Sequence, residues 1–225
     1  MHEVTALQIL TGLKPYRWQR RLFVDFLEGR IPDALDVPTG LGKTSVVGIW
    51  LAARALGGRV PRRLVYVVDR RAVVDQASSE AERLTSNLVK ALAGAAAPEI
   101  AEQWRANLQL DDERLPISTL RGQFADNWLW LENPARAAIV VGTVDMIGSR
   151  MLFEGYGVGS RMRPVHAALI ANDTLVVLDE AHLVLPFQEL VRAATRFRRP
   201  APVPPMKQLA LSATGSVREN ESVFR

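Results

Sequence analysis

The chain has 225 residues, of which 48% are apolar and 23% are charged, and it contains no cysteine. This composition predicts a globular protein with a sizeable core, and it excludes a disulfide framework and a thiolate metal site. The formal net charge of +4 suits a nucleic-acid partner, although a coding bias toward arginine explains it equally well. The N-terminus lacks the pattern of a signal peptide, and the most apolar run, residues 46–56, contains Arg54 and is too short to span a bilayer. We therefore expect a cytoplasmic protein without a membrane partner.

The first motif along the chain is KPYRWQRRLF, which carries Gln19. A side-chain amide offers both a donor and an acceptor, and this combination matches the edge of an adenine base. We therefore expect Gln19 to recognise adenine, the alternative being a solvated glutamine on a helix. Tyr16 or Trp18 could stack on the base, but each is equally suited to the core.

The second motif is the stretch LDVPTGLGKTS, which has the pattern of a phosphate-binding loop. DALDV predicts a short buried strand before it, and SVVGIWLAARAL predicts a helix after it, whose N-terminus favours an anion. Gly40 and Gly42 supply permissive backbone, Lys43 supplies the cation, and Thr44 supplies a hydroxyl for Mg²⁺. Val37 departs from the pattern, which usually opens with Gly or Ala, and the alternative is a glycine-rich turn with a stray lysine. The predicted nucleotide contacts in the loop are Thr39, Gly40, Leu41, Gly42, Lys43, Thr44 and Ser45.

Four further apolar runs predict strands, namely RLVYVVD, AAIVVGT, TLVVLDE and QLALSAT. Each lacks clean alternation, which is typical of strands that are buried on both faces of a parallel sheet. Helical segments lie between them, for example residues 71–92, so the fold class is expected to be α/β with a mostly parallel sheet and helices on both faces. We expect residues 1–225 to form one domain, with an inserted helical lobe at about residues 92–134.

The run TLVVLDEAHLV completes the predicted catalytic site. A buried strand delivers Asp179 and Glu180 at its carboxyl end, where open α/β sheets bind their ligands. Asp179 is expected to hold Mg²⁺, Glu180 to orient and deprotonate the attacking water, and His182 to contact the group that senses the γ-phosphate. The alternative is a strand that ends in a solvated acidic turn.

These motifs together resemble the first RecA-like domain of a superfamily 2 helicase of the DEAH type. PTGLGKT, DEAH and SAT stand in the order of that family, and the segment around Gln19 resembles its adenine-recognising motif. The resemblance implies that ATP and Mg²⁺ are the cofactors. It also implies that Ser212 and Thr214 couple ATP hydrolysis to movement of nucleic acid.

Three other segments resemble the places where this family contacts a nucleic-acid backbone. VVDRRAVVDQA carries Arg70 and Arg71 at the end of a strand, STLRGQ carries Arg121 and Gly122 in a loop, and VGTVDM carries Thr143 before a helix. For each of them the alternative is a surface turn or a helix cap.

The chain is similar in particular to the CRISPR-associated helicase–nuclease of type I systems. The run from GYG through RPVHAALI to the aspartate before DEAH carries most of this resemblance, which extends over about residues 16–215. It implies a helicase that moves along single-stranded DNA in the 3′ to 5′ direction and degrades the DNA. It also implies that a CRISPR RNA-guided surveillance complex recruits the enzyme.

Two parts of that family are not expected in this chain. The three histidines, His2, His166 and His182, do not have the spacing of a histidine–aspartate (HD) nuclease, and no segment corresponds to a second RecA-like domain. We expect both parts elsewhere in a longer protein or on a separate chain, so the isolated domain should bind ATP weakly and hydrolyse it poorly. Two alternatives remain: another superfamily 2 helicase or translocase, of the RNA or restriction type, and a non-catalytic nucleotide-binding module that recruits a partner.

Overall fold

The computed structural model describes residues 3–38, 40–94, 98–112, 114–121, 124–125, 127–197, 201–212 and 222–224. Three residues with predicted roles, Thr39, Gly122 and Thr214, lie outside these ranges. Within the described ranges, no helix is both long and apolar enough to cross a membrane.

The secondary structure alternates between strands and helices along most of the chain. The strands are β1 (Ala34–Asp36), β2 (Arg63–Val68), β3 (Ile117–Arg121), β4 (Phe124–Ala125), β5 (Ala138–Thr143), β6 (Thr174–Leu178), β7 (Lys207–Ser212) and β8 (Val223–Phe224). The α-helices are α1 (Glu3–Thr11), α2 (Arg17–Leu27), α3 (Val46–Ala55), α4 (Arg71–Ala93), α5 (Pro98–Leu108), α6 (Leu129–Glu132), α7 (Val144–Met151), α8 (Arg163–Ala171) and α9 (Leu185–Arg196). Two short 3₁₀ helices, η1 (Lys43–Ser45) and η2 (Ala181–Leu183), lie at the carboxyl sides of β1 and β6.

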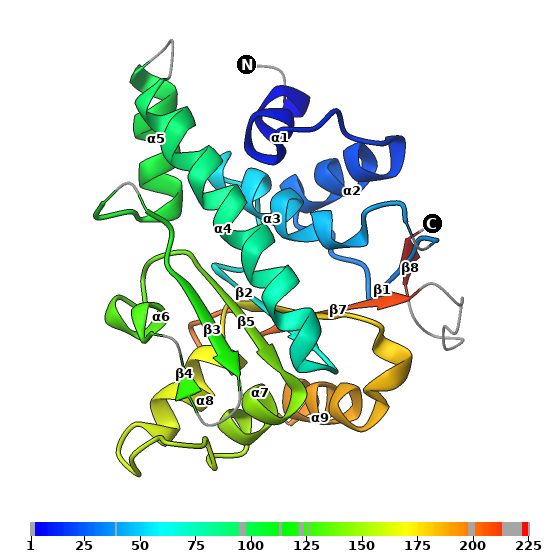
Figure 1. The fold of residues 1–225 in the computed structure, drawn as a ribbon, viewed down its shortest axis with the longest axis vertical. Coiled ribbons are helices and arrows are strands. Elements are labelled where there is room, and N and C mark those ends of the chain that lie inside the picture. The colour runs from blue at the N-terminus through cyan, green and yellow to red at the C-terminus, as the bar shows by residue number, and fades with distance from the viewer. Residues whose placement is uncertain are drawn as a thin grey trace.

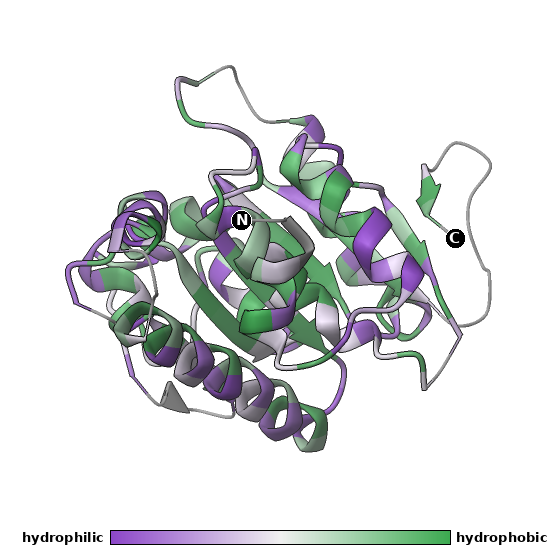
Figure 2. Cartoon of the chain, turned by 90° about the horizontal axis from the view of Figure 1, so that it is seen from above, coloured by the Kyte–Doolittle hydropathy of each residue, from purple (hydrophilic) through white to green (hydrophobic). Residues whose placement is uncertain are grey.

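The strands form one sheet in the order β4-β3-β5-β2-β6-β7-β1-β8, in which only β4 runs antiparallel to its neighbour. Helices α1 to α5 pack on one face of the sheet and α6 to α9 on the other (Figure 1). The view from above shows the apolar strands enclosed between these two layers (Figure 2). The predicted α/β class, with a mostly parallel sheet covered on both faces, is therefore confirmed.

The central strands are apolar throughout because both of their faces are covered. Every residue of β2, β5 and β6 is buried. Side chains alternate along a strand, so Leu64 and Tyr66 of β2 join the core beneath α1 to α5, whereas Val65 and Val67 join the core on the opposite face. This alternation decides which strand residues can reach the candidate site.

The structure corrects the expected helical lobe at residues 92–134. Helix α5 lies in this segment, but β3 is a strand of the main sheet that pairs in parallel with β5. The apolar pattern missed β3 because two of its buried positions are polar. The hydroxyl groups of Ser78 and Thr119 lie 2.9 Å apart, and the Ser118 hydroxyl donates to Asn127 Oδ1 at 2.5 Å, so hydrogen bonds satisfy both polar side chains within the fold.

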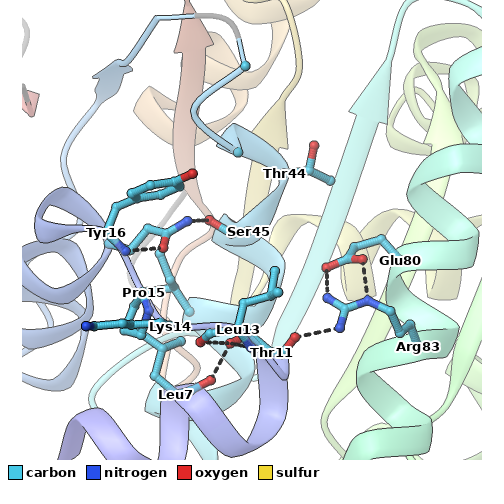
Figure 3. Close-up of a pocket in the computed structure, with 14 residues that line it drawn as sticks. Leu7, Thr11, Leu13, Lys14, Pro15, Tyr16, Thr44, Ser45, Glu80 and Arg83 are labelled. Carbon is cyan, nitrogen blue, oxygen red and sulfur yellow. Dashed lines mark hydrogen bonds and ion pairs between the residues drawn. The ribbon is translucent and has the colours of Figure 1, made fainter.

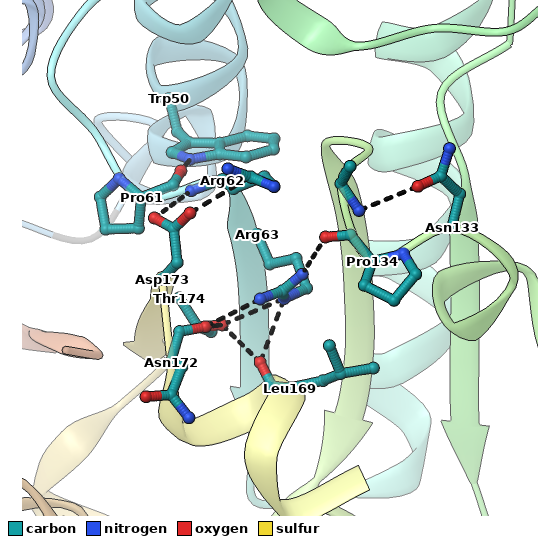
Figure 4. Close-up of polar contacts among 11 residues, drawn as sticks. Trp50, Pro61, Arg62, Arg63, Asn133, Pro134, Leu169, Asn172, Asp173 and Thr174 are labelled. Atoms are coloured by element: carbon teal, nitrogen blue, oxygen red, sulfur yellow. Dashed lines mark hydrogen bonds and ion pairs between the residues drawn. The ribbon is translucent and has the colours of Figure 1, made fainter. Parts of the chain in front are cut away.

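A buried arginine forms hydrogen bonds with the segments at the amino ends of the central strands (Figure 4). Arg63, which is 4% exposed, begins β2, and its guanidinium donates to the carbonyls of Pro134 at 2.9 Å, Asn172 at 2.8 Å and Leu169 at 3.1 Å. A longer bond of 3.4 Å reaches the hydroxyl of Thr174. Burial lowers the pKa of Arg63 to about 10, which still leaves it charged at neutral pH. This arginine therefore joins the starts of β2, β5 and β6 at the edge opposite the candidate site.

Candidate nucleotide-binding site

The sheet order places the predicted ATP-binding motifs side by side at the carboxyl edge. Strand β7 lies between β1, which leads into the phosphate loop, and β6, which leads into the DEAH motif. Asp36 at the end of β1 pairs in register with Ser212 at the end of β7, and the carbonyl of Ser212 accepts from the amide of Val37 at 3.3 Å. Ser212 therefore lies beside the start of the phosphate loop.

The phosphate loop has the backbone conformation that its glycines allow. Gly40 and Gly42 have φ angles of 83° and 73°, in the left-handed region that L-residues with side chains rarely adopt. A Cβ at Gly40 would meet no atom within 4 Å, so its φ angle, and not crowding, accounts for the glycine. Thr44 and Ser45 follow in η1 and lead directly into α3, as the predicted strand–loop–helix order requires.

Lys43 and Glu180 are brought together from opposite halves of the chain. The Nζ atom of Lys43 lies 3.2 Å from Oε1 of Glu180, and the lysine side chain is only 9% exposed. His182 Nδ1 lies 3.5 Å from the other carboxylate oxygen of Glu180. Glu180 itself has φ 44° and ψ 54°, a left-handed conformation that is strained for a residue with a side chain.

Asp179 is more deeply placed than Glu180. Its amide donates to the carbonyl of Val67 at 2.9 Å, which fixes the end of β6 against β2, and its Oδ1 accepts from the amide of Glu180 at 3.1 Å. Burial raises the pKa of the Asp179 carboxyl above its usual range, and the charge of Glu180 adds to this effect. A cation bound at this carboxylate would offset both effects.

The residues of this site are chemically suited to bind Mg²⁺ and a nucleoside triphosphate. Mg²⁺ prefers oxygen ligands, and the Thr44 hydroxyl and the Asp179 carboxylate both belong to this site. The open backbone at Gly40 leaves room for phosphate oxygens next to the N-terminus of α3. Lys43 provides the positive charge that a triphosphate needs.

Gln19 is connected directly to the phosphate loop. Its Nε2 donates to the Ser45 hydroxyl at 2.7 Å, and its Oε1 accepts from the amide of Tyr16 at 2.8 Å. Gln19 is 9% exposed, so it is not the solvated glutamine of the alternative interpretation. Of the two candidate stacking residues, Trp18 packs against the core, whereas Tyr16 is 54% exposed.

A cavity of about 610 Å³ separates the Gln19 segment from α4 (Figure 3). Tyr16 and Lys14 lie on one side of it, and the ion pair between Glu80 and Arg83 lies on the other. Gly40, Gly42, Thr44, Ser45 and Gln19 also line it. The cavity is thus continuous with the phosphate loop, as a pocket for a nucleoside would be.

The predicted nucleic-acid contacts lie farther along the same edge of the sheet. Strands β3, β5 and β2 are consecutive neighbours, and Arg121, Thr143 and Arg70 stand at or next to their carboxyl ends. Arg70 and Arg71 are exposed. Nε of Arg70 lies 3.6 Å from Oδ2 of the neighbouring Asp69, so the two side chains form an ion pair. Arg121 forms an ion pair with Asp75 on α4.

Thr143 is the N-cap of α7, and a helix cap was the alternative to its predicted phosphate contact. It is 6% exposed, and its hydroxyl caps α7 by accepting from the amide of Met146 at 3.4 Å. The sheet thus brings Arg70, Arg71, Arg121 and Thr143 to one edge. The hydroxyl of Thr143 is used there as the cap of α7.

The comparison with family models decides the family. Residues 16–223 match the model of the DEAD/DEAH box helicase, which is most of the chain. The chain belongs to the DEAD/DEAH box helicase family. It is therefore a superfamily 2 helicase domain with a RecA-like fold, as its motifs predicted. No curated protein sequence matches it.

Solved structures of other helicases share the fold of this helicase domain. The DUF1998 helicase MrfA bound to DNA has a TM-score of 0.56 at 16% identity, over 95% of this chain and 26% of that one. Dbp5 of S. cerevisiae, bound to Gle1 and IP6, has a TM-score of 0.51 at 13% identity, over 99% and 49%. The yeast DEAD-box splicing factor Prp28 has a TM-score of 0.50 at 15% identity, over 95% and 45%. The helicase domain thus spans between a quarter and half of these chains.

One residue of this helicase domain lies at the site without having been predicted from the sequence. Tyr66 on β2 is 1% exposed, and its hydroxyl is near both Thr44 and Asp179. The only signal in the sequence is an aromatic residue with a polar tip in an otherwise aliphatic strand. The apolar pattern alone assigned Tyr66 to the core, because the position of its hydroxyl depends on the register of β2 and β6.

Proposed function

We propose that this domain is the ATP-binding half of a DNA helicase or translocase that unwinds target DNA and feeds it to a nuclease in CRISPR interference. The observation that carries the ATPase part is the cluster of Lys43, Asp179 and Glu180 around the glycine loop. The CRISPR assignment is supported by the sequence resemblance, above all by the run that forms α8 and leads into β6. In this proposal the partners are single-stranded DNA, a guide-RNA surveillance complex, a second RecA-like domain and an HD nuclease.

Each residue of the cluster has a distinct role in the proposed hydrolysis. The backbone of residues 39–45 and Lys43 hold the phosphates, while Gln19 holds the adenine. Thr44 and Asp179 would hold Mg²⁺, and the ion would supply positive charge next to the transferred phosphoryl group. Glu180 orients the attacking water and accepts its proton, and His182 holds the Glu180 carboxylate from the other side. Ser212 and Thr214 would transmit the nucleotide state to the edge of the sheet where Arg70, Arg71 and Arg121 would contact the DNA backbone, and Gly122 would add a backbone contact.

A module that only binds nucleotide and recruits a partner is the weaker alternative. Such a module needs a phosphate loop, but it does not need a strained glutamate next to the loop lysine. The position of Glu180 at 3.2 Å from Lys43 therefore favours an enzyme. An RNA helicase would have the same ATP site, so the geometry of this site does not separate the two nucleic acids.

The choice of nucleic acid is tested by the stimulation of ATP hydrolysis. We expect single-stranded DNA to increase the rate of the protein that carries this domain by about tenfold or more, and RNA of the same sequence to increase it much less. Steady-state phosphate release with matched 40-nucleotide DNA and RNA oligomers measures this. Stronger stimulation by the RNA would refute the DNA assignment and favour the RNA helicase.

A further inference from the structure

Tyr66 occupies a position from which its side chain can act on the nucleotide site. It pairs in register with Val177 of β6, and residues paired in this way in parallel strands point to the same face of the sheet. Asp179 follows Val177 by two positions and therefore points to that face as well. Tyr66, Val177 and Val47 of α3 belong to the same core. The ring of Tyr66 is thus directed into the space between β6 and the start of α3.

The hydroxyl of Tyr66 is buried, and no described group meets the full geometry of a hydrogen bond with it. Thr44 and Asp179 are the polar side chains close to it. A tyrosine hydroxyl is protonated at neutral pH, so it can donate a hydrogen bond. An unsatisfied buried hydroxyl costs stability, and a phenylalanine would fill the same space without that cost. The hydroxyl therefore calls for an explanation other than packing.

We propose that Tyr66 is a positioning residue that donates a hydrogen bond to the Asp179 carboxylate when Asp179 holds Mg²⁺. This inference rests on the proposed function. The amide of Glu180 donates to the Asp179 carboxylate at 3.1 Å, but it belongs to the neighbouring residue and moves with it. A donor from β2 would hold the carboxylate from a second, independent strand. Donors that hold a metal-binding side chain in this way typically raise metal affinity by 10- to 100-fold.

The proposal is tested with Tyr66→Phe, which removes only the hydroxyl. The exposed Tyr156 on the opposite layer provides a matched control, Tyr156→Phe. Binding of a fluorescent ADP is measured during titration with MgCl₂ for the wild-type chain and both variants. We expect Tyr66→Phe to raise the Mg²⁺ concentration at half-saturation about tenfold, and Tyr156→Phe to leave it unchanged. Unfolding by urea without nucleotide or metal should show Tyr66→Phe to be at least as stable as wild type, because an unpaired hydroxyl is lost.

A double-mutant cycle identifies the partner of the hydroxyl. In an Asp179→Asn background the carboxylate is gone, so Tyr66→Phe should have no further effect on the Mg²⁺ dependence. If Tyr66→Phe binds Mg²⁺ and ADP as the wild type does, or if its effect is the same in the Asp179→Asn background, Tyr66 is only a core residue. A wild-type chain that binds no ADP at any Mg²⁺ concentration would instead overturn the proposed ATPase function, and this inference with it.

Discussion

Replacing Glu180 with glutamine is expected to lower ATP turnover by about 10²- to 10³-fold while leaving ATP binding intact. Glutamine keeps the size of the side chain but cannot accept the proton of the attacking water, and a positioned general base contributes a rate factor of about this size. The ion pair between Glu180 and Lys43 is lost in the variant. The carboxylate then no longer competes with the phosphates for the Lys43 ammonium group. The binding of Mg²⁺ and ATP should therefore be equal to that of the wild type or slightly tighter.

Phosphate release and nucleotide binding, measured on the protein that carries this domain, separate these two effects. Glu102→Gln on the exposed side of α5 makes the same chemical change away from the site and should have no effect. A recruitment module would show unchanged function in Glu180→Gln. Unchanged turnover would also remove Glu180 from its catalytic role.

The largest expected loss of stability comes from Arg63→Met. Methionine fills part of the space but removes the guanidinium donors from the partly buried carbonyls of Pro134, Leu169 and Asn172. The Thr174 hydroxyl lies 2.8 Å from the Leu169 carbonyl and 3.0 Å from the Asn172 carbonyl, and its single proton can satisfy one of them. Each unsatisfied buried acceptor costs about 1–3 kcal/mol. Removing a buried charge returns part of that cost, because the lowered pKa of Arg63 shows that its charge is held at a disadvantage. We expect a net loss of about 2 kcal/mol in the free energy of unfolding.

Urea unfolding of the chain measures this loss, with Arg161→Met at an exposed position as the control. Arg63→Lys should lie between the wild type and Arg63→Met, because one ammonium group cannot reach both the carbonyl of Pro134 and those at the end of α8. A stability of Arg63→Met within 0.5 kcal/mol of the wild type would mean that its hydrogen bonds only offset the cost of the buried charge.

The arrangement of the candidate nucleotide site was predictable from the sequence because its parts are local. The glycines around Leu41 fix the loop conformation within a few residues, and the apolar run before Asp179 identifies a buried strand wherever that strand lies in the sheet. The proximity of Lys43 to Glu180 followed from the rule that ligands bind at the carboxyl ends of parallel strands. The structure has this arrangement, with β7 inserted between the two motifs.

Other features depend on contacts that no local pattern records. Ser118 and Thr119 made β3 look like part of a loop, because their hydrogen-bond partners come from distant segments. Thr143 was predicted as a phosphate contact, and its use as a helix cap appears only in the geometry of α7. The position of Tyr66 next to Asp179 depends on the register between β2 and β6, which the sequence of neither strand specifies.

The central claim is that the glycine loop and Lys43 bind the triphosphate of ATP. Calorimetric titration of the chain with ATP in the presence of Mg²⁺ tests it most directly, with Lys43→Ala and the exposed Lys90→Ala measured in parallel. We predict measurable binding by the wild type and by Lys90→Ala, and binding weaker by about tenfold or more in Lys43→Ala, because a charged donor to phosphate is lost. Equal ATP affinity of all three proteins, or no binding by any of them, would contradict it.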